Sequence, residues 1–167
     1  MDIEKRFEHG ELYSADSIHF ADSLKYYTLR KHRVVYGGGG IMPDVFVPLD
    51  TTQYTKFLRQ MAARSYIINA NLKYIDVNRK QLKKQFATFN DFNARFEVPQ
   101  SLIDDVVQAA EKDKIKPKDQ QELQATLPQL RRQLKALIAR DLWDMSEYFQ
   151  VINETNPIVV KAVGLLK

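Results

Sequence analysis

The glycine run Gly37–Gly40 is the first feature of this 167-residue sequence that could do chemistry, because glycine-rich loops can hold phosphate groups. A phosphate loop needs a strand before it, a helix after it, and usually a lysine and a hydroxyl group. Here the apolar segment Asp44–Pro48, with strand character, follows the run, and no Gly-Lys-Ser/Thr sequence is present. The run therefore indicates a tight backbone crossing that requires positive φ angles, and we expect no nucleotide or other cofactor.

A serine nucleophile needs a partnered base and an oxyanion donor. The six serines are Ser14, Ser17, Ser23, Ser65, Ser101 and Ser146. None has a strand before it and a helix after it, and Ser101 is better explained as a helix cap. The three histidines, His9, His19 and His32, have carboxylates near them only within a polar segment. The residues therefore predict no catalytic group in this chain.

Metal chemistry has little support in the composition. The chain has no cysteine, which excludes disulfides, thiolate zinc sites and a thiol nucleophile, and three histidines are too few for a histidine-rich metal site. The paired acids Asp104 and Asp105 are predicted to lie in the first turn of a helix, where the helix dipole favours negative charge. We therefore expect no metal-binding residue.

A basic cluster lies in the middle of the chain. It comprises Lys73, Arg79, Lys80, Lys83 and Lys84, and carries a net charge of +4 once Asp76 is included. Such a cluster could bind nucleic acid or acidic lipid. Basic helical faces are more often simply solvated, so we expect no nucleic acid.

The composition is that of an ordinary globular protein. The chain is 44% hydrophobic and 28% charged, with a formal net charge of +4. No stretch approaches the roughly 18 apolar residues that cross a bilayer, and the charged start lacks a secretory signal. Residues 1–51 hold six basic and eight acidic side chains, whereas residues 52–167 hold 19 and 13. The glycines and histidines also gather in the first part, which places a domain boundary near residue 51.

Residues 1–51 are predicted to contain short strands. Leu24–Leu29 and Arg33–Tyr36 are rich in aromatic and β-branched residues, and the polar segment between them reads as a hairpin turn. Asp44–Pro48 would form a third strand that Pro48 ends. Three short strands cannot bury a core, so we expect them to belong to a sheet whose other strands lie elsewhere.

Residues 52–167 are predicted to be helical. Thr51 or Thr52 would cap a first helix, whose apolar side chains recur at helical spacing: Phe57, Leu58, Met61 and Ile68. A second helix is predicted over 75–86, and a short one over 89–96. After Pro99, Ser101 would cap a helix whose apolar face holds Leu102, Val106, Val107 and Ala110, and a polar linker follows over 112–118.

The strongest periodicity predicts one long helix over 123–152. Its stripe alternates spacings of four and three: Leu123, Leu127, Leu130, Leu134, Leu137, Asp141, Met145 and Tyr148. Pro128 would lie in the first turn, with Thr126 as cap, or else kink the helix. Asn156 and Pro157 would open a last helix over 158–166. The stripe permits a homodimer, but neighbouring amphipathic segments favour an internal partner. The predicted fold is therefore mainly α, a bundle-like domain after a short β segment.

The stretch from Thr28 to Asp50 carries a resemblance. It contains Val-Val-Tyr-Gly-Gly-Gly-Gly-Ile-Met-Pro-Asp followed by Val-Phe-Val-Pro. This stretch resembles the segment that closes the protease domain of the bacterial carboxy-terminal processing (tail-specific) serine peptidases. There, a strand runs to a Gly-Arg turn, then through a glycine-rich link to Gly-Ile-x-Pro-Asp and a final apolar strand. The order Tyr74, Asp76, Asn78, Arg79 resembles the branch with a helical C-terminal region, whereas His32 stands where the family usually has the turn glycine.

The resemblance implies that the serine nucleophile, the lysine base and the PDZ domain lie upstream of this chain. None of their motifs occurs here, so no catalytic residue transfers. The motif residues that transfer are structural: Arg33, Gly37, Gly38, Gly39, Gly40, Pro43 and Asp44. The glycines would let the chain cross close to the sheet, and Pro43 and Asp44 would fix the turn, with Asp44 accepting hydrogen bonds from the backbone or from Arg33.

Two functions remain open on the sequence. The resemblance implies the C-terminal part of a serine-type hydrolase of the bacterial cell envelope (periplasm), which cleaves the tails of proteins. In that case residues 1–51 end the protease domain, and residues 52–167 form a non-catalytic domain that packs, assembles or regulates. Its partners would be the protease and PDZ domains of the same protein. The alternative is an independent helical module whose basic face binds nucleic acid or an acidic protein.

Overall fold

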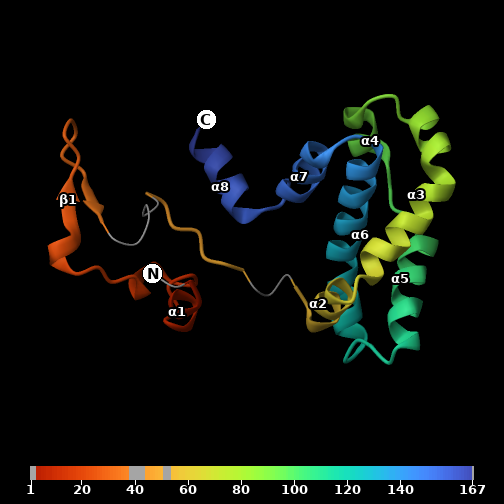
Figure 1. Ribbon diagram of the computed structural model, residues 1–167, viewed down its shortest axis with the longest axis horizontal. Coiled ribbons are helices and arrows are strands. Elements are labelled where there is room, and N and C mark those ends of the chain that lie inside the picture. The colour runs from red at the N-terminus through yellow and green to blue at the C-terminus, as the bar shows by residue number, and fades with distance from the viewer. Residues whose placement is uncertain (1–2, 38–43, 51–53, 167) are drawn as a thin grey trace. The chain divides into compact units, whose positions relative to one another are not determined.

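The computed structural model describes residues 3–37, 44–50 and 54–166, and divides into two compact units, Met1–Thr51 and Thr52–Lys167. The chain is mainly helical, and its described residues contain one sheet of two strands (Figure 1). The predicted fold class, a helical bundle preceded by a short β segment, is confirmed. Among the described residues, every helix falls short of the length or apolarity needed to cross a bilayer.

The first unit contains helix α1 (Ile3–Glu8) and the strands β1 (Lys25–Tyr27) and β2 (Val34–Tyr36). The strands pair antiparallel with Tyr26 opposite Val35, so the predicted hairpin is present with shorter strands. The predicted third strand is wrong, because the described residues 44–50 have no strand conformation. A strand needs a neighbouring edge, and this segment is tied instead by one backbone hydrogen bond, from Leu49 N to Leu12 O at 2.9 Å.

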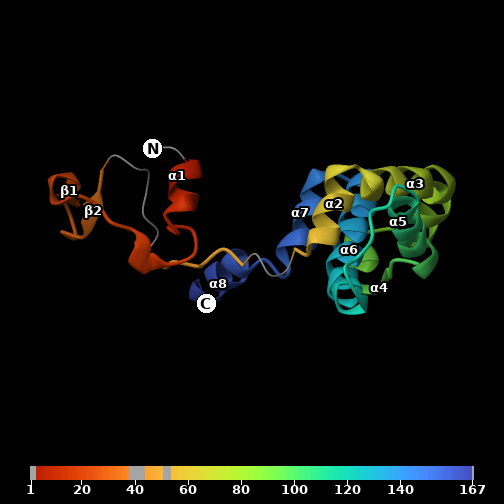
Figure 2. The ribbon, with the colours of Figure 1, turned by 90° about the horizontal axis from the view of Figure 1, so that it is seen from below.

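The second unit consists of helices connected by short loops. They are α2 (Lys56–Ala63), α3 (Tyr66–Gln85), α4 (Phe89–Arg95), α5 (Gln100–Lys112), α6 (Gln120–Leu142), α7 (Met145–Asn153) and α8 (Pro157–Leu165). Helix α6 lies at the centre and packs against α2, α3, α5 and α7. Figure 2 shows α2, α3, α5, α6 and α7 side by side in one bundle.

Helices α2 and α3 differ from their predictions at the break between them. The cap of α2 is Thr55, whose Oγ1 accepts from Leu58 N at 3.2 Å; Thr51 and Thr52 lie outside the described residues. Ser65 has a left-handed φ of 62°, which turns the chain into α3. The apolar face therefore shifts by one residue, so that Ile67 is buried and Ile68, predicted to face the core, is exposed.

Two predicted caps are wrong. Helix α5 begins at Gln100 after Pro99, so Ser101 lies inside it, and Asp104 and Asp105 lie in its second turn instead of its first. Helix α6 is capped by Asp119, whose carboxylate accepts from Glu122 N at 2.8 Å. The predicted cap for α6, Thr126, is fully buried inside the helix, and Pro128 lies in the helix interior.

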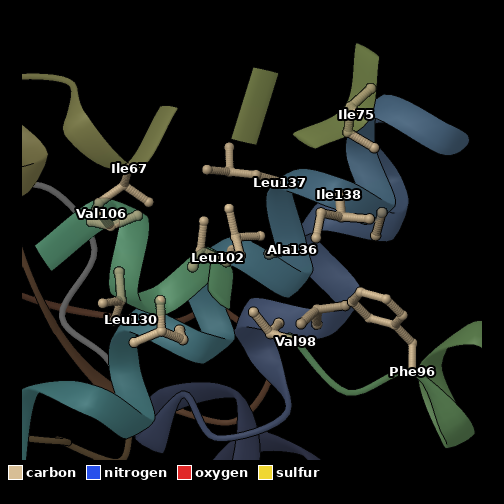
Figure 3. Close-up of a cluster of buried hydrophobic side chains, with 14 of the residues drawn as sticks. Ile67, Ile75, Phe96, Val98, Leu102, Val106, Leu130, Ala136, Leu137 and Ile138 are labelled. Carbon is tan, nitrogen blue, oxygen red and sulfur yellow. The ribbon is translucent and has the colours of Figure 1, made fainter. Parts of the chain in front are cut away.

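The long helix predicted over 123–152 is two helices. Helix α6 ends at Leu142, and Asp144 caps α7 by accepting from the Met145 amide. Three of the five leucines of the stripe are buried in the chain's own bundle: Leu130, Leu134 and Leu137. Figure 3 shows Leu130 and Leu137 beside residues of α3 and α5. The bundle interpretation is therefore confirmed, and these leucines offer no surface to a second copy.

Helix α4 is held by aromatic rings. Phe92 is fully buried and stacks on Phe96, with ring centroids 4.5 Å apart, while Trp143 lies 5.2 Å from it. The predicted short helix over 89–96 is confirmed, and Trp143, at the end of α6, joins the same cluster as Phe86.

The last helix begins as predicted. The Asn156 side chain accepts from Ile158 N at 3.0 Å, and Pro157 occupies the first position of α8. Helix α8 buries none of its residues.

Candidate functional site

The motif residues of the first unit are held in two ways. The Arg33 guanidinium donates to the Asp44 carboxylate, which is the contact expected from the sequence. Gly37 N donates to Leu24 O at 2.8 Å, and a Cβ on Gly37 would lie 3.0 Å from Cε2 of Tyr26. A Cβ at this position would therefore press on the Tyr26 ring, whereas Gly37 does not have the positive φ angle that was expected. Gly38, Gly39, Gly40 and Pro43 lie outside the described residues.

The residue before Arg33, His32, lies in the hairpin turn with a backbone conformation that is typical of glycine. His32 has a left-handed φ of 47°, a conformation that favours glycine. Thr28 closes the turn, since its carbonyl accepts from His32 N and its hydroxyl accepts from Arg33 N, both at 3.0 Å. The turn thus has the geometry of a glycine turn although histidine occupies it.

The serines and histidines do not converge. In residues 3–37, 44–50 and 54–166, no serine hydroxyl is hydrogen-bonded to a histidine or lysine side chain. Ser14 Oγ accepts from Asp16 N, and Ser146 Oγ donates to Glu147, at 3.2 and 2.8 Å. Within the same residues, no three histidine or acidic side chains are grouped so as to hold a metal ion.

The basic cluster does not form one face of α3. At 100° per residue, Lys80 and Lys84 lie within about 20° of Lys73 around the helix, whereas Arg79 is about 120° away. The Arg79 guanidinium donates to the Asp141 carbonyl oxygen, so this side chain hydrogen-bonds the C-terminal end of α6. Lys73, Lys80 and Lys84 form the part of the cluster that shares one exposed stripe; we call these three residues the α3 stripe.

An open groove lies between α3 and α5. Its volume is about 600 Å³, and polar side chains line much of it, among them Lys73, Asn78 and Gln108. Tyr66 and Tyr74 form part of its wall; burial raises the pKa of Tyr74, and the hydrogen bond to Asp113 raises that of Tyr66. The groove has the size of a ligand cleft.

A buried polar network joins α3 to α6. Asn71 is fully buried and donates from Nδ2 to Asp141 Oδ2 at 2.6 Å, while Arg140 pairs with the other carboxylate oxygen at 2.9 Å. The sequence placed Asp141 in the apolar stripe and did not single out Asn71. The only sign of this pair in the sequence was that Asp141, a polar residue, occupies a position of the apolar stripe. Its partner Asn71 lies 70 residues away along the chain.

One comparison with known proteins gives a match. A family of unknown function, DUF8443, matches residues 57–144. The chain belongs to this family. The DUF8443 region extends from α2 to the cap of α7, so it includes the central helix α6 and the network of Asn71 and Asp141. It includes none of the segment from Thr28 to Asp50. No curated protein and no solved structure matches the chain.

The prediction from the sequence did not include a second cluster of cations, which lies inside the DUF8443 region. The segment predicted as a polar linker holds four lysines in seven residues: Lys112, Lys114, Lys116 and Lys118. The loop between α5 and α6 brings three of them to one pocket with residues of α2. The high density of lysines in this segment was the feature of the sequence that could have indicated the cluster.

Proposed function

We propose that this chain is the C-terminal part of a Ser/Lys carboxy-terminal processing peptidase, which cleaves the tails of proteins in the bacterial cell envelope. In this proposal the first unit completes the protease-domain sheet. The helical unit is non-catalytic and packs against, assembles or restricts access to the protease. The resemblance over Thr28–Asp50 suggests the peptidase, and the burial pattern of the first unit supports it.

The described residues of the first unit form no hydrophobic core of their own. Among its described residues only Glu11 is buried, and that carboxylate is paired with Arg6 Nε at 2.9 Å. The hairpin exposes apolar side chains on both faces, with Tyr26 and Val35 on one face and Tyr27 and Val34 on the other. An isolated two-stranded hairpin is marginal in water, and a unit this small needs a partner surface. A missing protease sheet would supply the strands and the core.

The closing segment supports the same arrangement. Gly37 lets the chain pass directly over Tyr26, and Arg33 holds Asp44 from the other side of the glycine run. The contact between Arg33 and Asp44 ties residues 44–50 to the hairpin. In the peptidase, a neighbouring strand edge would pair with residues 44–50 and make them the last strand.

The first experiment is an immunoblot of the source cells with an antibody raised against the helical unit. A native band far above 19.4 kDa, with upstream serine and lysine motifs in its peptides by mass spectrometry, is the expected result. A band near 19.4 kDa without such peptides would contradict the proposal. The purified 167-residue chain should not hydrolyse casein, and hydrolysis that survives removal of contaminants would show that this chain is itself catalytic.

A second candidate function rests on the α3 stripe. Three aligned lysines, Lys73, Lys80 and Lys84, are exposed on a helical unit with excess positive charge. An independent module of this kind would bind nucleic acid or an acidic protein, with affinity that falls steeply as salt rises. Absence of any gel shift with single- or double-stranded DNA at low salt would reject the nucleic-acid form of this candidate.

A further inference from the structure

A pocket of about 400 Å³ lies between α2 and the loop that joins α5 to α6. Five cationic side chains line it: Lys56, Arg64, Lys114, Lys116 and Lys118. All five residues are exposed. We call this site the lysine pocket; neither the peptidase proposal nor the α3 stripe uses it.

The two carboxylates of the lysine pocket are already engaged by neutral donors. Glu122 accepts from Lys118 N at 2.7 Å and from Phe57 N at 3.0 Å, and these backbone hydrogen bonds lower its pKa. Asp113 accepts from the Tyr66 hydroxyl. Within residues 54–166, no ion pair joins any of the five cations to a carboxylate. The pocket therefore has three positive charges in excess, and none of its five cations forms an ion pair within residues 54–166.

The lining restricts the class of ligand. The apolar members of the wall, Phe57 and Ile115, are only 1% and 6% exposed, so their surfaces are covered. The pocket therefore has no aromatic platform on which a base could stack and no apolar side chain that could enter a bilayer. Its volume lies at the lower end of small-molecule sites. A small anion with several charges suits both the volume and the excess charge.

Lys114 adopts a backbone conformation that is unfavourable for a residue with a Cβ. Lys114 has a left-handed φ of 62° in the turn that ends α5, at the position where glycine is usual. Its backbone N donates to Glu111 O, and Ile115 N donates to Ala110 O, both at 3.0 Å. This turn directs the chain so that Lys114, Lys116 and Lys118 all line one pocket.

We propose that the lysine pocket binds an anion that carries phosphate groups with at least two negative charges, either a free small molecule or the headgroup of a lipid. Lysine is a common phosphate ligand because its ammonium group acts as a point charge with three donors. Because the side chains are exposed, each contributes modestly, and the affinity depends on salt.

The test measures binding of inorganic pyrophosphate to the full 167-residue chain by calorimetry in 50 mM NaCl. We expect one site, and about threefold weaker binding for each lysine removed. The triple variant Lys114→Gln, Lys116→Gln, Lys118→Gln should therefore bind roughly 30-fold more weakly. Its matched control removes the same charge from the α3 stripe: Lys73→Gln, Lys80→Gln, Lys84→Gln. This control should change the affinity by less than about twofold, because the stripe lies outside the pocket.

Three outcomes would overturn the proposal. They are no binding at 10 mM pyrophosphate, equal weakening by the two triple variants, and equally tight binding of citrate, which has similar charge but no phosphate. If the loop triple variant does not fold, the single variants Lys116→Gln and Lys118→Gln carry the test, each with a threefold loss. Vesicles with 20% phosphatidic acid distinguish the sources. Competition with pyrophosphate assigns a lipid headgroup, and the absence of competition beside pyrophosphate binding assigns a free anion.

Discussion

Replacing Lys114 with glycine is expected to stabilise the helical unit, although the change removes a side chain from the lysine pocket. Lys114 stands at the left-handed position that ends α5, with a φ of 62°. Two backbone hydrogen bonds of 3.0 Å close this turn, from Lys114 N to Glu111 O and from Ile115 N to Ala110 O. Neither bond uses the lysine side chain, so glycine preserves both.

The magnitude follows from two opposing effects. A left-handed conformation costs a residue with a Cβ about 1.5 kcal/mol, and glycine removes that cost. Glycine also gives the unfolded chain more freedom, which lowers stability by about 0.7 kcal/mol. The expected net gain for Lys114→Gly is about 0.8 kcal/mol in the free energy of unfolding, which corresponds to a rise of about 2–4 °C in Tm.

Urea unfolding of the full chain, followed by circular dichroism at 222 nm, measures this gain. The assay is run in 0.5 M NaCl, because salt screens the repulsion among the exposed cations. Lys114→Gln is the matched control, since it removes the charge but keeps the left-handed cost, and it should leave stability unchanged. If Lys114→Gly lowers stability, or if Lys114→Gln stabilises the chain equally, the backbone explanation is refuted.

Three further outcomes follow from other contacts. Phe92→Ala should lower the free energy of unfolding by about 3–5 kcal/mol in urea titrations, because the ring is fully buried beside Trp143. Glu122 has a lowered pKa in the folded state, so its stabilisation is complete above the unfolded value of 4.5 and is lost as the pH falls through the lower folded value. Urea titrations from pH 3 to 7 should therefore show a shallower acid loss for Glu122→Gln than for the original chain. Asp44→Asn should cost at most about 1 kcal/mol, because its partner Arg33 is exposed, and faster amide exchange in the hairpin would report it.

Local chemistry explains the elements that the sequence predicted well. Asn156 and Pro157 define the start of α8 within two residues, and the spacing of Phe89, Phe92 and Phe96 defines α4. The hairpin is equally local, because two short β-prone runs flank a polar turn. In each case the deciding interactions lie within a few residues along the chain.

The start of α6 shows a different kind of error. Pro128 suggested a helix that begins near residue 126, because proline favours the first turn. Asp119 and Glu122 form a stronger start signal, an N-cap acceptor with an acid three residues later, and the structure follows it. Proline is tolerated inside α6 because the surrounding helices hold the long helix in place.

Other features depend on residues far apart and could not be predicted from one sequence. The pair of Asn71 and Asp141 joins positions 70 residues apart, and the lysine pocket joins α2 to a loop some 50 residues later. The absence of a third strand at 44–50 has the same origin, since a strand forms only where another edge accepts it.

The two units differ in what they need from the rest of a protein. The helical unit contains a continuous core from Phe57 to Val151, and the family match over residues 57–144 lies within it. The first unit buries only Glu11 among its described residues, so its hairpin gains little from its own side chains. A helical domain with its own core does not need a partner surface to fold, whereas a hairpin with so little burial needs further strands or a helix to pack against. This asymmetry is the physical reason to seek the partner of this chain at the hairpin, and ligands of the helical unit on its charged surface.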